Sequence, residues 1–292
     1  MNVMWNLSVR NIKVYVRDRM SVFFSFLSVL IIIALYALFL GKIQVDSITD
    51  RVGDVQGVRF LVDSWIMSGL LGINAVTVAL GVLGTMVQDV EKKQFTDFIV
   101  APVNRTAVVV SYLVSAVVIS LAFSIVALLV SEVYIVLGGG QWLTLPNLLE
   151  ALGILILSSL TAASILYLVV SFQKTSSAFA TLSTLLGTMI GFLTGVYVPL
   201  GILPAIVQKF VLLVPFSHSA ALLRQVFLRQ PIDLVFHGAP QAAVDGYLRG
   251  NGVVLLWGDQ ALSAGVMLAV LGGAAALGLV LSALRMRSYK QK

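Results

Sequence analysis

Residues 107–137 decide the fold, because they read AVVVSYLVSAVVISLAFSIVALLVSEVYIVL and contain a single charged side chain. A helix needs about 20 apolar residues to cross a bilayer, and this run has 31. Such a run is typical of a tilted transmembrane helix. The whole 292-residue chain is similar, with 59% hydrophobic and 11% charged residues. Soluble domains carry about 25% charged residues, so the composition excludes a soluble enzyme, a disordered tail and a disulfide scaffold.

Six apolar runs are long enough to cross a membrane, so we predict an all-α integral membrane protein with six transmembrane helices. The predicted spans are residues 21–40, 65–87, 107–137, 148–172, 178–198 and 260–284. They form one transmembrane domain over residues 21–292. A polytopic protein of this kind has the lipid bilayer as a permanent partner.

The segment after the fifth span has shorter apolar runs. Its apolar runs at 205–214 and 217–228 are 10 and 12 residues long, which is too short to span. We therefore predict an extracellular re-entrant helical hairpin over residues 199–228, followed by an outer loop over 229–259. The hairpin residues of interest are Pro199, Pro204, Pro215, His218 and Arg224.

Residues 1–20 are predicted to form a cytoplasmic interfacial helix. An apolar stripe at helical spacing consists of Trp5, Val9, Ile12 and Val16. A polar stripe on another face consists of Asn6, Arg10, Lys13 and Arg17. Two such stripes are typical of an amphipathic helix lying in the membrane interface. The alternative is a basic flank that only sets the orientation.

The orientation follows from the distribution of Lys and Arg. With six spans, one side holds 12 of these residues and the other side holds seven. The positive-inside rule places the more basic side in the cytoplasm. Both termini are therefore predicted to be cytoplasmic, in a multi-pass protein of the cell membrane.

No catalytic, metal or nucleotide motif is found in the sequence. There is no phosphate loop, no H-E-x-x-H, no G-x-S-x-G and no cysteine, and there are only two histidines. We therefore expect no catalytic residue, no metal and no cofactor in this chain. Its net charge of +6 is scattered over the ends of apolar runs, so we also expect no nucleic-acid partner.

One acid, Glu132, lies inside an apolar run. An ionisable group in a span is a functional candidate by default. The alternative is that Glu132, close to the turn at Gly138, reaches interfacial water.

The loop after the second span, residues 88–106, is the best candidate for a partner contact. Residues 91–99 are predicted to form a two-turn helix with Phe95 and Phe98 on one side, and Pro102 ends it. Exposed phenylalanines favour a docking site for a protein over a solvated turn, which is the alternative.

The second and fifth spans carry polar or small residues at helical spacing. The glycines Gly187, Gly191 and Gly195 form G-x-x-x-G-x-x-x-G, which lets another helix approach closely. The hydroxyl stripe consists of Ser177, Thr181, Thr184 and Thr188, and the second span adds Asn74 and Thr77. Two interpretations remain open: packing within the chain, with hydroxyls bonded to their own helix, or a subunit interface or pathway wall.

Two groups of motifs resemble one known family. Glu91, Thr96-Asp97 and Pro102-Val103-Asn104-Arg105 resemble the E…G-T-x-E…P-x-x-R stretch of type-two ATP-binding-cassette (ABC) exporter permeases. Residues 201–204, 215–218 and 223–224 resemble that family's second signature after the fifth span. The resemblance covers nearly the whole chain. It departs from the family at Phe95, where the family often has Gly, and in the longer outer loop.

The resemblance implies a membrane permease subunit that is not an enzyme by itself. A separate nucleotide-binding ATPase subunit, in two copies, would bind ATP and Mg. The residues implied to couple this chain to it are Glu91, Phe95, Thr96, Asp97, Phe98, Pro102 and Arg105. Spans two and five of this chain and of a second copy or a paralogue would face each other around the route.

The substrate implied is a drug, a lipid, a lipid-linked sugar or a peptide, moved out of the cytoplasm. Two other classes remain open at this point. One is a secondary transporter or channel driven by an ion gradient, and the other is a membrane sensor or immunity protein without bulk transport.

Overall fold

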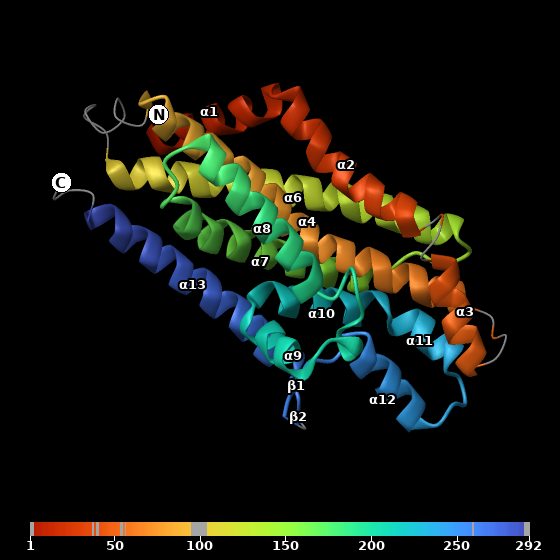
Figure 1. The fold of residues 1–292 in the computed structure, drawn as a ribbon. Coiled ribbons are helices and arrows are strands. Elements are labelled where there is room, and N and C mark those ends of the chain that lie inside the picture. The colour runs from red at the N-terminus through yellow and green to blue at the C-terminus, as the bar shows by residue number, and fades with distance from the viewer. Residues whose placement is uncertain are drawn as a thin grey trace.

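The computed structural model describes residues 3–36, 38, 41–52, 55, 57–94, 104–258 and 260–288. Over this part of the chain the protein is a bundle of helices with one small β-hairpin (Figure 1). Five helices are long and apolar enough to cross a membrane. The number rises to six if the bent pair α9 (Ala205–Leu213) and α10 (Pro215–Phe227) is one span. The chain is therefore a helical, multi-pass membrane protein.

The five long helices overlap the second to sixth predicted spans. They are α4 (Val58–Glu91), α6 (Arg105–Leu137), α7 (Leu145–Val170), α8 (Ser176–Leu193) and α13 (Ala264–Ser288). Helix α4 extends beyond the predicted 65–87 at both ends. Helix α8 ends before the predicted residue 198, because Gly195 adopts a left-handed φ of 68° that stops the helix.

Two helices precede this bundle. Helix α1 (Val3–Arg17) and α2 (Arg19–Leu35) meet at Asp18, whose carboxylate accepts hydrogen bonds from the Ser21 N–H at 3.2 Å and the Ser21 hydroxyl at 2.6 Å. The first bond satisfies a free backbone donor in the first turn of α2, and both bonds lower the pKa of Asp18. Helix α2 covers most of the predicted first span, 21–40, whose residues 37, 39 and 40 lie outside the described part.

The connecting segments are more ordered than the sequence suggested. Helix α3 (Gly41–Val52) lies in the polar segment after the first span. The predicted outer loop 229–259 contains two helices instead. The elements of this distal region are the short η2 (Leu200–Ile202), α11 (Arg229–Val235), α12 (Gln241–Gly250), and the antiparallel strands β1 (Leu256–Trp257) and β2 (Gln260–Ala261).

Arg229 holds this distal region against the bundle, and an aromatic contact packs two parts of the region on each other. Arg229 of α11 forms a two-pronged ion pair with Glu150 of α7, at 2.6 and 2.8 Å, and bonds Asn147 at 2.9 Å. The ring of Tyr247 in α12 lies 5.4 Å from that of Phe236. Apolar side chains on these short helices pack on the core, which the mixed composition of the segment had concealed.

The two ends of the bundle differ in content. Both termini lie at one end (Figure 1), together with the close of α4 and the turn between α7 and α8. We call this the N/C end. The opposite end, which holds α3, α11, α12 and the β-hairpin, is called the distal end.

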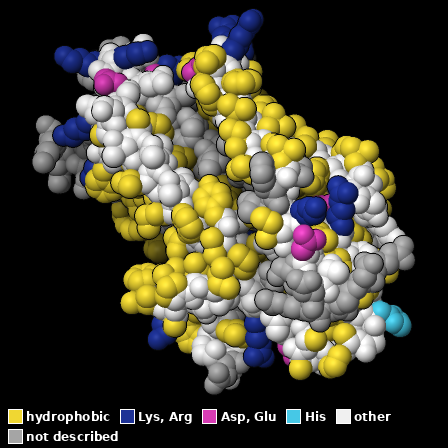
Figure 2. Space-filling model, turned by 45° about the vertical axis from the view of Figure 1, so that its right-hand side comes forward, with side chains coloured by type: hydrophobic (Ala, Val, Ile, Leu, Met, Phe, Trp, Pro, Cys, Tyr) yellow, Lys and Arg dark blue, Asp and Glu magenta, His cyan; other side chains and the backbone are white. Residues whose placement is uncertain are grey.

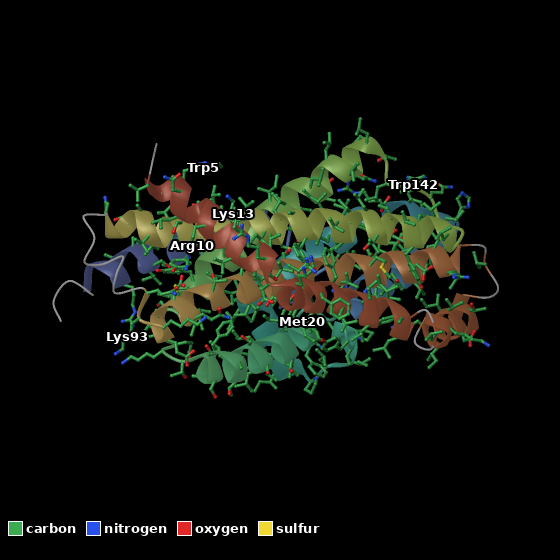
Figure 3. The ribbon with its side chains drawn as sticks, turned by 90° about the horizontal axis from the view of Figure 1, so that it is seen from above. Trp5, Arg10, Lys13, Met20, Lys93 and Trp142 are labelled. Atoms are coloured by element: carbon green, nitrogen blue, oxygen red, sulfur yellow. The ribbon has the colours of Figure 1, made fainter. Side chains whose placement is uncertain are left out.

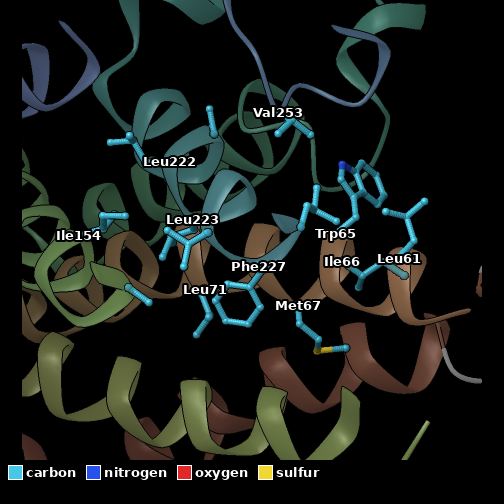
Figure 4. Packing of buried hydrophobic residues seen from close by; sticks show 14 of the residues in the cluster. Leu61, Trp65, Ile66, Met67, Leu71, Ile154, Leu222, Leu223, Phe227 and Val253 are labelled. Carbon is cyan, nitrogen blue, oxygen red and sulfur yellow. The ribbon is translucent and has the colours of Figure 1, made fainter. Parts of the chain in front are cut away.

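Helix α4 forms the centre of the bundle. It is apolar on all sides, and 89% of its most apolar stretch is buried, as expected for a helix surrounded by others. Figure 4 shows Trp65, Ile66 and Leu71 of α4 packed beside Leu223 and Phe227 of α10. The outer helices bury less; only 22% of the corresponding stretch of α13 is covered. Figure 2 shows the broad hydrophobic surface that results, which suits contact with lipid.

Close packing of α13 on α7 depends on Gly278. A Cβ there would lie 2.9 Å from the backbone carbonyl carbon of Ser164, which cannot move aside as a flexible side chain can. We expect Gly278→Leu to push α13 away from α7 and to lower the free energy of unfolding by about 1–3 kcal/mol. Thermal unfolding of the detergent-purified protein measures this effect.

The matched control is Gly273→Leu on the same helix, where nothing lies within 4 Å of an added Cβ. This variant should keep the melting temperature of the wild type. Equal melting temperatures for the two variants would contradict the packing argument.

Candidate functional site

The predicted coupling segment begins where α4 ends. Glu91 is the last residue of α4, the Lys92 N–H bonds the Gln88 carbonyl oxygen at 2.9 Å, and Lys93 has a positive φ of 61°. A left-handed residue cannot continue the helix. The prediction that Glu91 starts a separate helix was therefore wrong, because this residue completes α4.

Phe95, Thr96, Asp97, Phe98 and Pro102 lie outside the described residues. Arg105 is the first residue of α6, and the Asn104 side chain before it accepts a bond from the Thr106 N–H at 3.0 Å.

The last turn of α4 is bonded on one side to α1 and α6. Asp89 is only 4% exposed. Both of its oxygens accept from the Arg10 guanidinium of α1, one of them at 2.8 Å, and the Tyr112 hydroxyl of α6 donates to it at 2.5 Å. Hydrogen bonding to Asp89 raises the pKa of Arg10. Because the pair is bidentate, it fixes orientation as well as distance.

Helix α1 therefore has a different inner face from the one that its stripes suggested. Its buried residues are Ser8, Asn11 and Tyr15, and the Asn11 amide nitrogen lies 3.3 Å from the Ser111 hydroxyl of α6. Trp5 of the apolar stripe is 59% exposed, and Figure 3 shows it on α1 with Arg10 and Lys13. Trp5 and Val16 of the apolar stripe are thus free to face lipid, while Ile12 packs on the core and a polar side bonds the helix to the bundle.

The same turn of α4 is bonded on its other side to α8. A Glu91 carboxylate oxygen accepts from the Ser176 backbone N–H at 3.2 Å and from the Ser176 hydroxyl. Ser176 is the first residue of α8, after the N-cap Thr175. A carboxylate is stabilised at a helix N-terminus by the free N–H groups and the helix dipole. Glu91 therefore bonds inside the chain, on the fifth-span helix.

Helix α8 presents a face that no other described helix of the chain covers. Only 11% of its apolar stretch is buried. Thr181, Thr184 and Thr188 are exposed, and each hydroxyl bonds the carbonyl oxygen four residues earlier, at 3.2, 3.0 and 2.9 Å. The hydroxyls are thus bonded back to their own helix, with Leu185 and Met189 exposed beside them.

The three glycines of α8 do not form one continuous stripe. Nothing lies within 4 Å of a Cβ added at Gly187, but one at Gly191 would lie 2.1 Å from the ring of Tyr197. Gly195 lies beyond the helix end. Of the three, only Gly187 could admit another helix, because Gly191 accommodates a ring of the same chain.

The polar residues predicted within the second and third spans are bonded inside this chain. The Asn74 amide nitrogen contacts the Ser124 hydroxyl of α6 at 3.3 Å, and the Thr77 hydroxyl bonds the Ile73 carbonyl oxygen of its own helix at 3.3 Å. Glu132 is buried and accepts from the Leu143 N–H at 2.8 Å. It therefore holds the turn between α6 and α7.

The residues of the predicted hairpin hold the distal end together. Pro199 precedes η2, Pro204 precedes α9, and Pro215 begins α10, which is bent by 92° from α9. A His218 ring nitrogen lies 2.9 Å from the Leu212 carbonyl oxygen. Arg224 is 1% exposed and donates to the Gly195 carbonyl oxygen at 2.9 Å, with its guanidinium carbon 5.2 Å from the Trp65 ring centroid.

We call the bonds of Asp89 with Arg10 and Tyr112 the clasp, and we expect it to contribute to stability. Asp89→Asn removes the charge that Arg10 and Tyr112 both bind, and hydrogen bonds to a charged group contribute about 1.5–3 kcal/mol. The melting temperature should fall clearly. Arg17→Gln, on the exposed part of α1, is the control and should melt like the wild type. Unchanged melting of Asp89→Asn would show that the clasp contributes nothing.

Comparisons with known proteins identify the family of the chain. The family model described as ABC-2 type transporter matches residues 2–228. Nodulation protein J from Rhizobium leguminosarum bv. trifolii is 35% identical over 96 residues, which are 33% of this chain and 36% of that protein. The match with this relative thus spans well under two thirds of its length. Because the family model covers more than half of the chain, this protein belongs to the ABC-2 type transporter family, the membrane permeases of ABC transporters.

Proposed function

We propose that this chain is half of the membrane pathway of an ATP-driven exporter. The observation that carries the proposal is the junction at the end of α4. Its last turn is bonded to α1 and α6 through Asp89 and to α8 through Glu91. The stretch that resembles the family's coupling motif begins in this turn, at Glu91. A partner that pulls on this motif would therefore act on all four helices.

The proposed partner is a nucleotide-binding ATPase subunit in two copies. It supplies the ATP and Mg sites, since the chain has no phosphate-loop motif. Closure of the ATPase dimer around ATP would shift the permease between two states, and only contacts that differ between these states can transmit energy. In this proposal the N/C end lies in the cytoplasm and the protein in the cell membrane.

The uncovered face of α8 is proposed to meet a second copy of this chain or a close paralogue. Self-bonded hydroxyls alternate there with Leu185 and Met189. Such a surface suits an amphipathic substrate: a drug, a lipid, a lipid-linked sugar or a peptide. The outward direction follows the family resemblance.

The need for a partner gives the first test. Purified alone and reconstituted in vesicles, the chain should not hydrolyse ATP or move substrate. Added to the ATPase subunit, it should give ATP-dependent transport. ATP hydrolysis by the chain alone, or uptake driven by an ion gradient without the partner, would contradict the proposal.

The proposed contact between the α8 helices of two subunits gives the second test. The chain has no cysteine, so single cysteines can be introduced on a clean background. Among Thr181→Cys, Thr184→Cys and Thr188→Cys, at least one should form a crosslinked dimer in membranes with a short thiol-reactive reagent. Val280→Cys is the matched control, because Val280 is also exposed but lies on α13. Absence of crosslinking at all three α8 positions would contradict this interface.

A further inference from the structure

The distal end of α8 is held by buried hydrogen bonds. The carbonyl oxygens that close the helix and the turn after it, those of Leu193, Gly195 and Val196, each accept a bond from another element. The donors are Ser217 at 2.9 Å, Arg224 at 2.9 Å and Tyr36 at 2.8 Å, and all three are buried. Breaking the Arg224 bond would leave a buried charge with fewer partners, which is strongly unfavourable. This end is therefore pinned.

The N/C end of α8 is held differently. Its first residue, Ser176, bonds the Glu91 carboxylate, and Glu91 is exposed. Three residues further along α8, the ring of Phe179 packs on Gly84 of α4, where an added Cβ would lie 2.8 Å from the ring. An exposed carboxylate exchanges a protein donor for water at small net cost. An apolar ring on a glycine can slide or separate without leaving a polar atom unbonded.

We propose that the Glu91–Ser176 contact is a latch that opens and closes in each transport cycle. When it opens, the N/C end of α8 moves away from α4 while the pinned distal end stays in place. This inference rests on the proposed function and assigns Glu91 a different role from the one implied by the family resemblance. Glu91 is a positioning residue inside the chain and not a docking contact for the ATPase subunit.

The position of the latch in the chain explains what operates it. Glu91 is followed closely by the coupling segment, and the left-handed Lys93 turns the chain between them. Asp89, two residues earlier, is buried and bonded to Arg10 and Tyr112. A displacement of the coupling segment therefore acts first on the exposed Glu91, while the buried Asp89 keeps the turn of α4 attached to α1 and α6.

A reversible crosslink tests the latch. Glu91→Cys and Ser176→Cys are introduced together into the cysteine-free chain, which is reconstituted with its ATPase subunit in vesicles. A short bifunctional thiosulfonate reagent then joins the two thiols. We expect transport to fall at least tenfold, substrate-stimulated ATP turnover to fall with it, and a reductant to restore both. Each single-cysteine variant is the control, and treatment with the same reagent should leave its transport at the value measured before treatment.

Non-crosslinked variants separate a latch from a docking contact. Ser176→Ala removes the hydroxyl donor, and Glu91→Gln removes the charge. The double variant should transport no worse than the more impaired single variant, because both changes act on one contact. Ser176→Thr keeps the hydroxyl and should restore the transport that Ser176→Ala loses. Co-purification of the ATPase subunit should stay as in the wild type. If Glu91→Gln loses the subunit while Ser176→Ala has no effect, Glu91 is a docking residue and the latch is wrong.

Failure of the latch and failure of the proposed function give different results. Wild-type transport by the fully crosslinked protein would overturn the latch and leave the exporter proposal intact. Lack of ATP-dependent transport by the wild-type complex would overturn both.

Discussion

Burial of α4 on all sides is the constraint on which the rest of the structure depends. Helices α6, α7, α8 and α10 each place one face on α4, and the opposite faces of the outer helices remain open to the surroundings. Packing of this kind is close and resists small displacements. A movement at the end of α4 is therefore carried to several helices at once, which makes that end suitable for receiving force.

The helices of the bundle could be predicted from the sequence because length and apolarity are local properties. The ends of α4 could not, since the predicted boundaries 65 and 87 stopped short of Asp63 and Asp89. Both acids lie inside the helix, and each has a basic partner. The Arg59 Nε lies 3.5 Å from an Asp63 carboxylate oxygen, and Arg10 binds Asp89. A buried charge is acceptable when it is paired. The spacing of Arg59 and Asp63 is local to the helix, but the pairing of Arg10 with Asp89 arises only in the folded chain.

The candidate site was predictable only in part for the same reason. The coupling motif identified Glu91, but its partner Ser176 is 85 residues away, and Arg10 is 79 residues from Asp89. No periodicity within one helix connects such residues. The spacing of Thr181, Thr184 and Thr188 correctly indicated one face of α8. It could not show that Asn74, another polar residue at mid-span, is bonded within the bundle.

The hydroxyls of α8 also explain how this helix can carry polar side chains and still be free to move. In lipid an unbonded polar group costs several kcal/mol, so a helix that depended on polar bonds to a neighbour would be fixed to it. Each threonine hydroxyl instead bonds a carbonyl oxygen of α8 itself, and these bonds travel with the helix. In the proposed dimer, the middle of α8 could therefore exchange α4 for a second subunit or a substrate without breaking the bonds of these hydroxyls. Resistance to its movement is concentrated at the two ends, where buried Arg224 holds one and exposed Glu91 the other.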